Sequence, residues 1–122
     1  MKTEKGKSID AVKYVGDKTK IESARIEKMK HGEVVKIVSE EVPFKAEDSL
    51  PEDKKLHASA IFGLQRNEAE ELIIIQDGKF DKFLKAKQIE ITETYEVGDN
   101  IKELLGVECV IQKNADGFLE LA

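Results

Sequence analysis

The sequence is poor in the residues that metal sites, disulfides and cysteine-based active sites require: it contains one cysteine, two histidines and no tryptophan. The single cysteine, Cys109, cannot form an intramolecular disulfide, and it lies in the alternating run VECVIQ, where a small buried thiol is expected. The surroundings of His31 and His57 suggest no pairing with that thiol, and ligand pairs at zinc-site spacing are absent. We therefore expect no metal, no cofactor and no catalytic cysteine.

Long apolar runs are absent too. None approaches the roughly 18 residues that a membrane-spanning helix needs, and residues 72–75 are long enough only for a buried strand. The basic start, MKTEKGKSID, lacks the apolar stretch of a secretory signal. With 122 residues, 40% of them hydrophobic and 37% charged, the chain has the balance of one soluble globular domain, without an evident internal repeat. We expect a cytoplasmic protein that has no membrane partner.

Motifs of the common enzyme classes are missing from the sequence. It contains no phosphate-binding P-loop, no G-x-S-x-G, no H-E-x-x-H and no calcium-loop spacing. Carboxylates are abundant, but a pair of carboxylates indicates acid–base catalysis only within a cleft that raises one pKa. The sequence therefore predicts a protein that is not an enzyme.

Charge is distributed unevenly along the chain. The formal net charge is −5, but residues 1–39 contain ten Lys and Arg against six Asp and Glu, whereas residues 40–122 contain ten against nineteen. The basic first third could face an anionic partner. Residues 40–55 form an acidic connection that contains Pro43 and Pro51, and this connection could contact a basic protein or remain solvated.

Alternating apolar residues predict the strands. In residues 19–29 the alternation shifts once, between Ile21 and Ala24, so we expect a long strand with one bulge; a helix is the alternative. KHGE at 30–33 and NADG at 114–117 are turn signals. The expected strands are 19–29, 34–39, 55–64, 107–113 and 118–122, with 71–75 as a hairpin partner of the third and 88–95 as a further strand or an extended connection.

Two short helices are expected between the third and fourth strands of this series. The first has Asp77 as its N-cap. Its apolar stripe consists of Phe80, Phe83 and Leu84. The second begins at Asp99 and ends before Gly106, a residue type that tolerates the left-handed conformation of a helix C-terminus. Its apolar face consists of Ile101, Leu104 and Leu105.

The order of three strands, a helical insert and two strands, together with the passage LLGVECVIQ, resembles that of OB-fold binding proteins of the type that binds single-stranded nucleic acid. The resemblance implies a mainly β fold, a five-stranded OB-like barrel over residues 16–122 with a helical insert between strands 3 and 4. Residues 1–15 are expected to be a loose basic arm or a lead-in strand. A β-sandwich-like α+β fold, in which 71–75 and 88–95 serve as extra strands, is the alternative.

The resemblance also implies a function. OB domains of this kind bind single-stranded DNA or RNA across strands two and three, with a cationic groove for the backbone and aromatic faces for the bases. Several cations fall on or beside the expected face. Four aromatic residues, Tyr14, Phe44, Tyr95 and Phe118, are not assigned to the core, but none lies on the expected face of strand two or three. Phe118 alternates with Leu119 and Leu121, so either it or they face outward. Each of these side chains could also be merely solvated or packed. The candidate residues are Arg25, Lys28, Lys30, Lys36, Lys55, Arg66 and Lys113, with Phe44 and Phe118 as stacking candidates.

A protein–protein interaction or assembly module without a nucleic-acid partner is the alternative function. The acidic total and the scarcity of exposed aromatic residues favour it. Such a module would bind a protein partner or form a homo-oligomer through an edge strand such as 71–75, whose LIII run needs to be covered.

Overall fold

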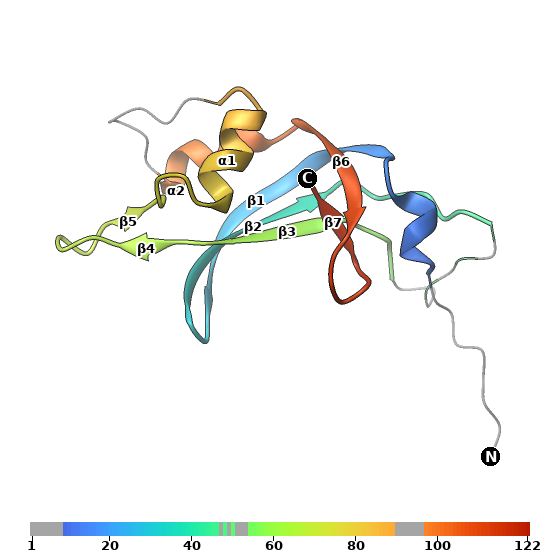
Figure 1. The fold of residues 1–122 in the computed structure, drawn as a ribbon, viewed down its shortest axis with the longest axis horizontal. Helices are drawn as coiled ribbons and strands as arrows, with labels where there is room; N and C mark the ends of the chain where they lie inside the picture. The colour runs from blue at the N-terminus through green and yellow to red at the C-terminus, as the bar shows by residue number, and fades with distance from the viewer. Residues whose placement is uncertain (1–8, 47, 49, 51–53, 90–96) are drawn as a thin grey trace, which may run out of the picture.

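The computed structural model describes residues 9–46, 48, 50, 54–89 and 97–122. In this part of the chain, five strands close into a barrel in the order β1-β2-β3-β7-β6 (Figure 1). Strands β3 and β7 pair in parallel, and the other neighbours are antiparallel. This confirms the mainly β, OB-like barrel with a helical insert between its third and fourth strands. The barrel strands are β1 (Lys18–Met29), β2 (Gly32–Ser39), β3 (Ser59–Gly63), β6 (Glu108–Lys113) and β7 (Leu119–Leu121).

The long first strand closes the barrel because it pairs with two neighbours in turn. Residues 18–20 pair with β6, and residues 21–29 pair with β2. The register with β2 shifts between Ile21 and Ser23, which confirms the bulge that the sequence predicts and rules out the helical alternative. The sandwich alternative is wrong too, because it would leave β1 and β6 in separate sheets. The β1–β6 pairs are Lys18 with Val110, Thr19 with Cys109, and Lys20 with Glu108.

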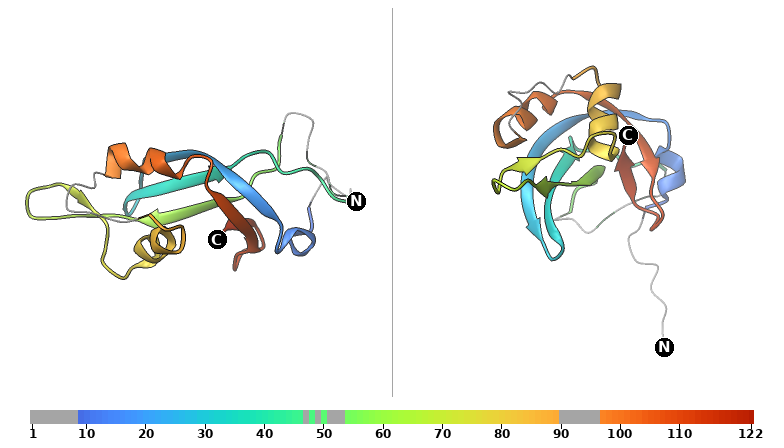
Figure 2. Two further views of the ribbon diagram at one scale, coloured as in Figure 1. Left: turned by 90° about the horizontal axis from the view of Figure 1, so that it is seen from above. Right: turned by 60° about the vertical axis from the view of Figure 1, so that its left-hand side comes forward.

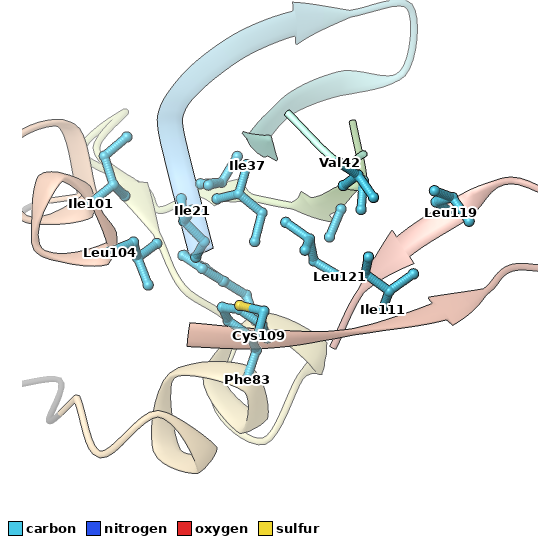
Figure 3. Close-up of a cluster of buried hydrophobic side chains, with 14 of the residues drawn as sticks. Ile21, Ile37, Val42, Phe83, Ile101, Leu104, Cys109, Ile111, Leu119 and Leu121 are labelled. Carbon is cyan, nitrogen blue, oxygen red and sulfur yellow. The ribbon is translucent and has the colours of Figure 1, made fainter. Parts of the chain in front are cut away.

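Inward-facing side chains fill the barrel. Alternate residues of a strand point to one face, and Val35 and Ile37 of β2 and Ile111 of β6 have no exposed surface. Figure 3 shows side chains from the barrel strands converging with Leu104 from the helical insert. Cys109 is 1% exposed, which confirms the expected buried thiol. Burial raises the pKa of this thiol, so the nucleophilic thiolate is disfavoured.

The first helix of the insert, α1 (Lys79–Ala86), packs against β3. Phe80, Phe83 and Leu84 are buried, as the periodicity predicts. Phe62 of β3 meets two of them, with ring centroids 5.1 Å from Phe80 and 5.0 Å from Phe83. This aromatic cluster attaches the helix to the barrel.

Asp77 is not the N-cap of α1, contrary to the sequence prediction. The N-cap is Gly78, and no side chain caps it. The backbone N–H of Asp77 instead donates to Asp81 Oδ2 at 2.7 Å, and Asp81 forms an ion pair with Lys85 at 3.1 Å. The hydrogen bond from Asp77, followed by that from Lys85, lowers the pKa of the Asp81 carboxyl. The carboxylate of Asp81, inside the first turn, therefore stabilises the helix start, and the carboxylate of Asp77, which precedes the helix, does not cap it.

Residues 9–15 do not form the expected lead-in strand. Ala11–Tyr14 form a 3₁₀ helix, η1. Tyr14 is fully buried, and its hydroxyl accepts a hydrogen bond from the backbone N–H of Lys45 at 2.9 Å. This short helix is therefore part of the packed domain, because a bulky side chain anchors it; residues 1–8 lie outside the described residues.

The second expected helix, 99–105, is replaced by two shorter pieces, α2 (Val97–Asn100) and the 3₁₀ helix η2 (Ile101–Leu104). The first and last residues of η2 are buried as predicted, but Leu105 is 49% exposed. A 3₁₀ helix has three residues per turn, so positions three apart share the core face and the next residue turns away. Gly106 has a φ of 83°, the left-handed conformation expected there.

An internal repeat, not expected from the sequence, relates the segment η1–β1 to the segment η2–β6. The backbone N–H of Gly16 donates to the carbonyl of Ile111 at 2.9 Å, and at the other end of the same ladder Gly106 donates to Ile21 at 2.8 Å. Each segment thus places a short helix and a glycine turn against the end of the other's strand. This arrangement fixes both ends of the β1–β6 seam.

Two further strands, β4 (Gln65–Arg66) and β5 (Leu72–Ile73), form a separate hairpin that extends beyond the barrel after β3 (Figure 2). A hairpin strand does form within the expected range 71–75, but it pairs with β4 and not with the third barrel strand, β3. Of the expected strand 88–95, residues 88 and 89 are not in a strand, and 90–96 lie outside the described residues.

Candidate nucleic-acid interface

The outer face of the barrel carries a row of three side chains across three strands. The strand register sets Arg25 of β1 beside Lys36 of β2, and Lys36 beside Ile61 of β3. Because the neighbours of Lys36 along β2 point into the barrel, Lys36 points outward. Ile61 is 49% exposed, which is unusual for an isoleucine in the middle of a sheet. The row thus joins two cations to an exposed apolar surface.

The charge on this row is only partly compensated. Arg25 forms an ion pair with Glu27 at 2.6 Å. Lys36, in contrast, forms no ion pair with any residue that the structure describes. The next row along the sheet contains Val34 and Gly63, and a Cβ built on Gly63 would meet nothing within 4 Å. Within the described residues, the face therefore combines an ammonium group that forms no ion pair with open space beside Gly63.

The β1–β2 hairpin lies at one end of this face. Lys30, at its tip, is exposed, and Gly32 has a φ of 134° that lets the turn form. Lys28 is also exposed, but it alternates with Glu27 and so lies on the opposite face of the hairpin from Arg25. The tip contributes positive charge to the end of the outer face.

Besides Arg25, two further candidate cations already have acidic partners. Arg66 contacts Glu33 through Nε at 2.8 Å and Nη2 at 2.7 Å, and it also donates to the backbone carbonyl of Glu70. Lys55 lies 3.9 Å from Glu41. These pairs are partly exposed and therefore weak, so a phosphate could replace the carboxylate only in competition with it.

The β6–β7 hairpin presents the most exposed aromatic side chain among the described residues. Phe118 is 66% exposed, whereas its neighbour Leu119 is buried, so Phe118 faces outward. Asn114 orders the turn, because its Oδ1 accepts the backbone N–H of Asp116 at 3.0 Å and of Phe118 at 2.9 Å. Lys113 is exposed at the start of the same turn. The hairpin therefore offers a flat ring and a cation on an ordered support.

Phe44 belongs to a different feature, a surface pocket of about 420 Å³ at the end of the barrel where η1 packs. Phe44 is 42% exposed. Charges of both signs line the pocket, so it has no clear preference for an anionic ligand. The charged lining residues are Asp17, Lys18, Glu40, Glu41 and Lys45.

The fold brings only part of the predicted set together. In Figure 1 the β1–β2 and β6–β7 hairpins both point away from the side of the barrel that α1 covers. Arg25 and Lys36 are direct neighbours on the barrel face. Arg66 is held on the β4–β5 hairpin, and Phe44 is part of the pocket.

Two important neighbours of the site were not among the sequence candidates. Ile61 had a usable signal, since the alternation of β3 already points it outward. The ion pair between Glu27 and Arg25 had a weaker sequence signal, namely that residues two apart on a strand share a face.

Comparison with protein-family models, with curated proteins and with solved structures found no match to this chain. Among the described residues, no helix is long and apolar enough to cross a membrane. The same residues contain no cluster of three or more His, Cys, Asp or Glu side chains suited to a metal ion.

Proposed function

We propose that this protein binds single-stranded DNA or RNA across the outer face of β1, β2 and β3. The observation that supports the proposal is the row of Arg25, Lys36 and Ile61 on an OB-like barrel. Single-stranded nucleic acid needs a cation for its phosphates and a flat or apolar surface for its bases, and this row supplies both over neighbouring strands. The proposal includes the cytoplasmic location that the sequence predicts.

The two flanking hairpins extend this surface. Lys30 on the β1–β2 hairpin and Lys113 on the β6–β7 hairpin add positive charge at its edges, and Phe118 offers a ring on which a base can stack. Stacking on an aromatic ring does not depend on which base is present. Because no donor or acceptor pattern for base edges is evident on this face, we expect binding with little sequence preference.

The acidic partners limit the affinity. Phosphate must compete with Glu27 for Arg25 and with Glu33 for Arg66. The net charge of −5 also opposes the approach of a polyanion. We therefore expect moderate affinity that falls steeply with added salt, since each neutralised phosphate releases bound counterions.

Fluorescence anisotropy tests the proposal. A labelled single strand of about 20 nucleotides exceeds the roughly 4–16 nucleotides that one OB domain covers, and it is titrated with protein at low and at high salt. We expect saturable binding that weakens about tenfold or more between about 50 and 200 mM salt, because several phosphates are contacted. A matched duplex serves as the control and should bind less tightly. A flat trace at low salt, or an affinity indifferent to salt, would contradict the proposal.

A second candidate function is protein–protein assembly, and the β4–β5 hairpin favours it. The hairpin projects from the barrel, and Ile73 and Ile75 in and beside β5 are 37% and 42% exposed. Exposed apolar side chains on a projecting edge are typical of a surface that another chain covers.

A further inference from the structure

Two hairpins leave the barrel at the same end and diverge from each other (Figures 1 and 2). One is the β1–β2 hairpin, and the other is the β4–β5 hairpin that follows β3. The base of the β4–β5 hairpin is joined to the β1–β2 hairpin close to its tip, because Leu64 donates its backbone N–H to the carbonyl of Glu33 at 2.9 Å and Arg66 pairs with the Glu33 carboxylate at 2.7 Å. In the strand register, Glu33 lies opposite Lys28. This end of the molecule is therefore a fork with two separate tips.

The two tips carry opposite charge. We define the basic tip as Lys28, Met29, Lys30 and His31, and the acidic tip as Glu68, Glu70 and Glu71. All seven residues are exposed. No side chain of either tip forms an ion pair with another described residue. Two charge clusters of opposite sign, whose side chains form no ion pair with one another within the described residues, thus lie at one end of a small domain. The nearest opposite charges are Glu33, across the strand pair from Lys28, and Arg66, beside Glu70.

Hydrogen bonds order the backbone of the acidic tip, which fixes the positions from which its carboxylates project. The Oδ1 of Asn67 accepts the backbone N–H of Glu71 at 3.0 Å, and the backbone carbonyl of Asn67 accepts that of Glu70, also at 3.0 Å. Arg66 donates to the carbonyl of Glu70 as well. Ordered charges lose less conformational entropy on association than mobile ones do.

Apolar surface accompanies the charge on both hairpins. Met29, at the basic tip, is 46% exposed, and Ile73 and Ile75 on the other hairpin are 37% and 42% exposed. Strand β5 pairs only with β4 among the described strands, so its other edge has unpaired backbone groups in this part of the chain. An interface at the fork would therefore bury apolar side chains beneath its charged contacts.

We propose that the fork binds the fork of a second copy of this chain, so that the basic tip of each copy lies against the acidic tip of the other. Charge complementarity selects this occupant, since one chain supplies both halves of the contact. Because both tips lie at the same end of the barrel, a two-fold axis satisfies the two contacts at once and gives a closed dimer. Exposed ion pairs are screened by salt, so the dimer dissociates as ionic strength rises.

This inference does not depend on the proposed function, because it uses only contacts between protein charges. The two are linked at one point: Lys28 and Lys30 are also candidates for phosphate contact. A bound oligonucleotide and a second copy should therefore compete for the basic tip. Failure of the oligonucleotide to bind would leave the test of the dimer unaffected.

A charge-swap experiment tests the dimer. One variant carries Lys28→Glu with Lys30→Glu, so that both of its tips are acidic; the other carries Glu68→Lys with Glu70→Lys, so that both are basic. Sedimentation velocity at low salt should show the wild type as a dimer, and each variant should self-associate at least about tenfold more weakly, because like charges then face each other. An equimolar mixture of the two variants should recover the dimer. In the mixed dimer, an acidic tip of one variant faces a basic tip of the other at both contacts.

The controls separate this result from a general effect of charge or from misfolding. Lys20→Glu with Lys102→Glu makes the same charge change on exposed residues away from the fork, and it should leave the dimer intact. Circular dichroism melting checks that each variant folds. A wild type that stays monomeric at low salt, or a mixture that does not recover the dimer, would overturn the proposal.

Cross-linking of the wild type gives a second test that needs no variant. A carbodiimide joins lysine to carboxylate only where the two already touch. In a mixture of ¹⁴N- and ¹⁵N-labelled protein, we expect cross-links between Lys28 or Lys30 of one copy and Glu68 or Glu70 of the other, seen as mixed-isotope peptides. The absence of mixed-isotope cross-links between the two tips would count against the dimer.

Discussion

Lys36→Gln is the substitution whose effect on nucleic-acid binding follows most directly from the structure. Lys36 lies on the outer face of β2, between Arg25 and Ile61, and no described carboxylate neutralises it. Its neighbours Val35 and Ile37 fill the core, but its own side chain does not point inward. Replacing the ammonium group should therefore change binding and leave folding nearly unaffected.

The size of the effect comes from counterion release. A single contact to a phosphate of single-stranded nucleic acid releases about 0.7 of a counterion, so its loss lowers the slope of log K against log salt by about 0.7. If the contact contributes nothing at about 1 M salt, a tenfold lower salt concentration raises its contribution to K by a factor of 10 to the power of about 0.7. At about 0.1 M salt the contact therefore strengthens binding about fivefold. We expect Lys36→Gln to bind about fivefold more weakly there, and the difference should shrink as salt rises.

The assay is an anisotropy titration of the wild type and the variant over a series of salt concentrations, together with thermal melting of each. Lys82→Gln is the matched control, because Lys82 is exposed on α1 and far from the two hairpins that flank the face. It should change neither the affinity nor the slope appreciably. An unchanged slope for Lys36→Gln, or an equal loss of affinity for the control, would refute the assignment of Lys36 to the interface.

Four other predictions follow. Phe118→Ala should weaken oligonucleotide binding by about 1–3 kcal/mol if a base stacks on the ring, with an unchanged melting temperature; equal anisotropy curves for variant and wild type would exclude stacking there. Glu27→Gln should tighten binding at low salt by freeing its arginine partner, and weaker binding would contradict the competition between carboxylate and phosphate. Leu104→Ala should lower the free energy of unfolding, measured in urea, by about 2–5 kcal/mol because Leu104 is buried. Leu105→Ala should lower it by under about 1 kcal/mol because Leu105 is half exposed. Similar losses for the two variants would mean that the 3₁₀ geometry of η2 is wrong. Asp48→Asn should destabilise the protein near neutral pH, and its deficit in urea unfolding should vanish as the pH falls through the carboxyl range; a deficit that is independent of pH would contradict an ionised Asp48 as its source.

The sign of the Asp48 prediction comes from two opposing effects on its pKa. Burial acts to raise the pKa of the carboxyl, but polar interactions with the backbone of Asp10, with Tyr14 and with Lys13, whose Nζ lies 3.2 Å from Asp48 Oδ1, outweigh burial and hold the pKa below its ordinary value. A folded-state pKa below the unfolded one stabilises the fold above the unfolded pKa. This stabilisation is lost as the pH drops through the lowered value.

The barrel strands were predictable because their signals are local. The single shift in alternation between Ile21 and Ala24 predicts the bulge of β1, and alternation places Leu56 and Ala60 on the inner face of the third strand, where the structure buries them. The spacing of Phe80 and Phe83 similarly predicts the buried side of α1. In each case the period of the backbone determines which side chains face the core.

The wrong predictions of secondary structure concern short segments that form 3₁₀ helices, which the periodicity of the sequence does not distinguish from strands or α-helices. The segment at 11–14 is mostly apolar like a short strand, yet it forms a 3₁₀ helix because Tyr14 anchors it in the core. Leu105 was counted with Leu104 because an α-helix would bury both, whereas the tighter helix turns it outward. Such choices depend on tertiary contacts rather than on local sequence.

The candidate site was less predictable than the fold. The cations could be named from the sequence, but the pairing of Arg66 with Glu33 joins residues far apart in the chain, and only the register of the strands brings them together. The outward direction of Phe118 was left open, since it alternates with Leu119 and either could face the core. The repeat that relates Gly16 to Gly106 was missed, because the two segments share few identical residues and the relation lies mainly in their hydrogen bonds.

The most direct test of the nucleic-acid proposal is a residue-resolved map of where a single strand binds. Backbone amide signals of ¹⁵N-labelled protein are recorded during titration with a short unlabelled oligonucleotide at low salt. We predict that the largest shifts occur at Lys36, Ile61 and the turn at 114–118, and that the signals of α1 hardly move. Saturation with shifts confined to other parts of the surface, or no shifts at all, would contradict the account.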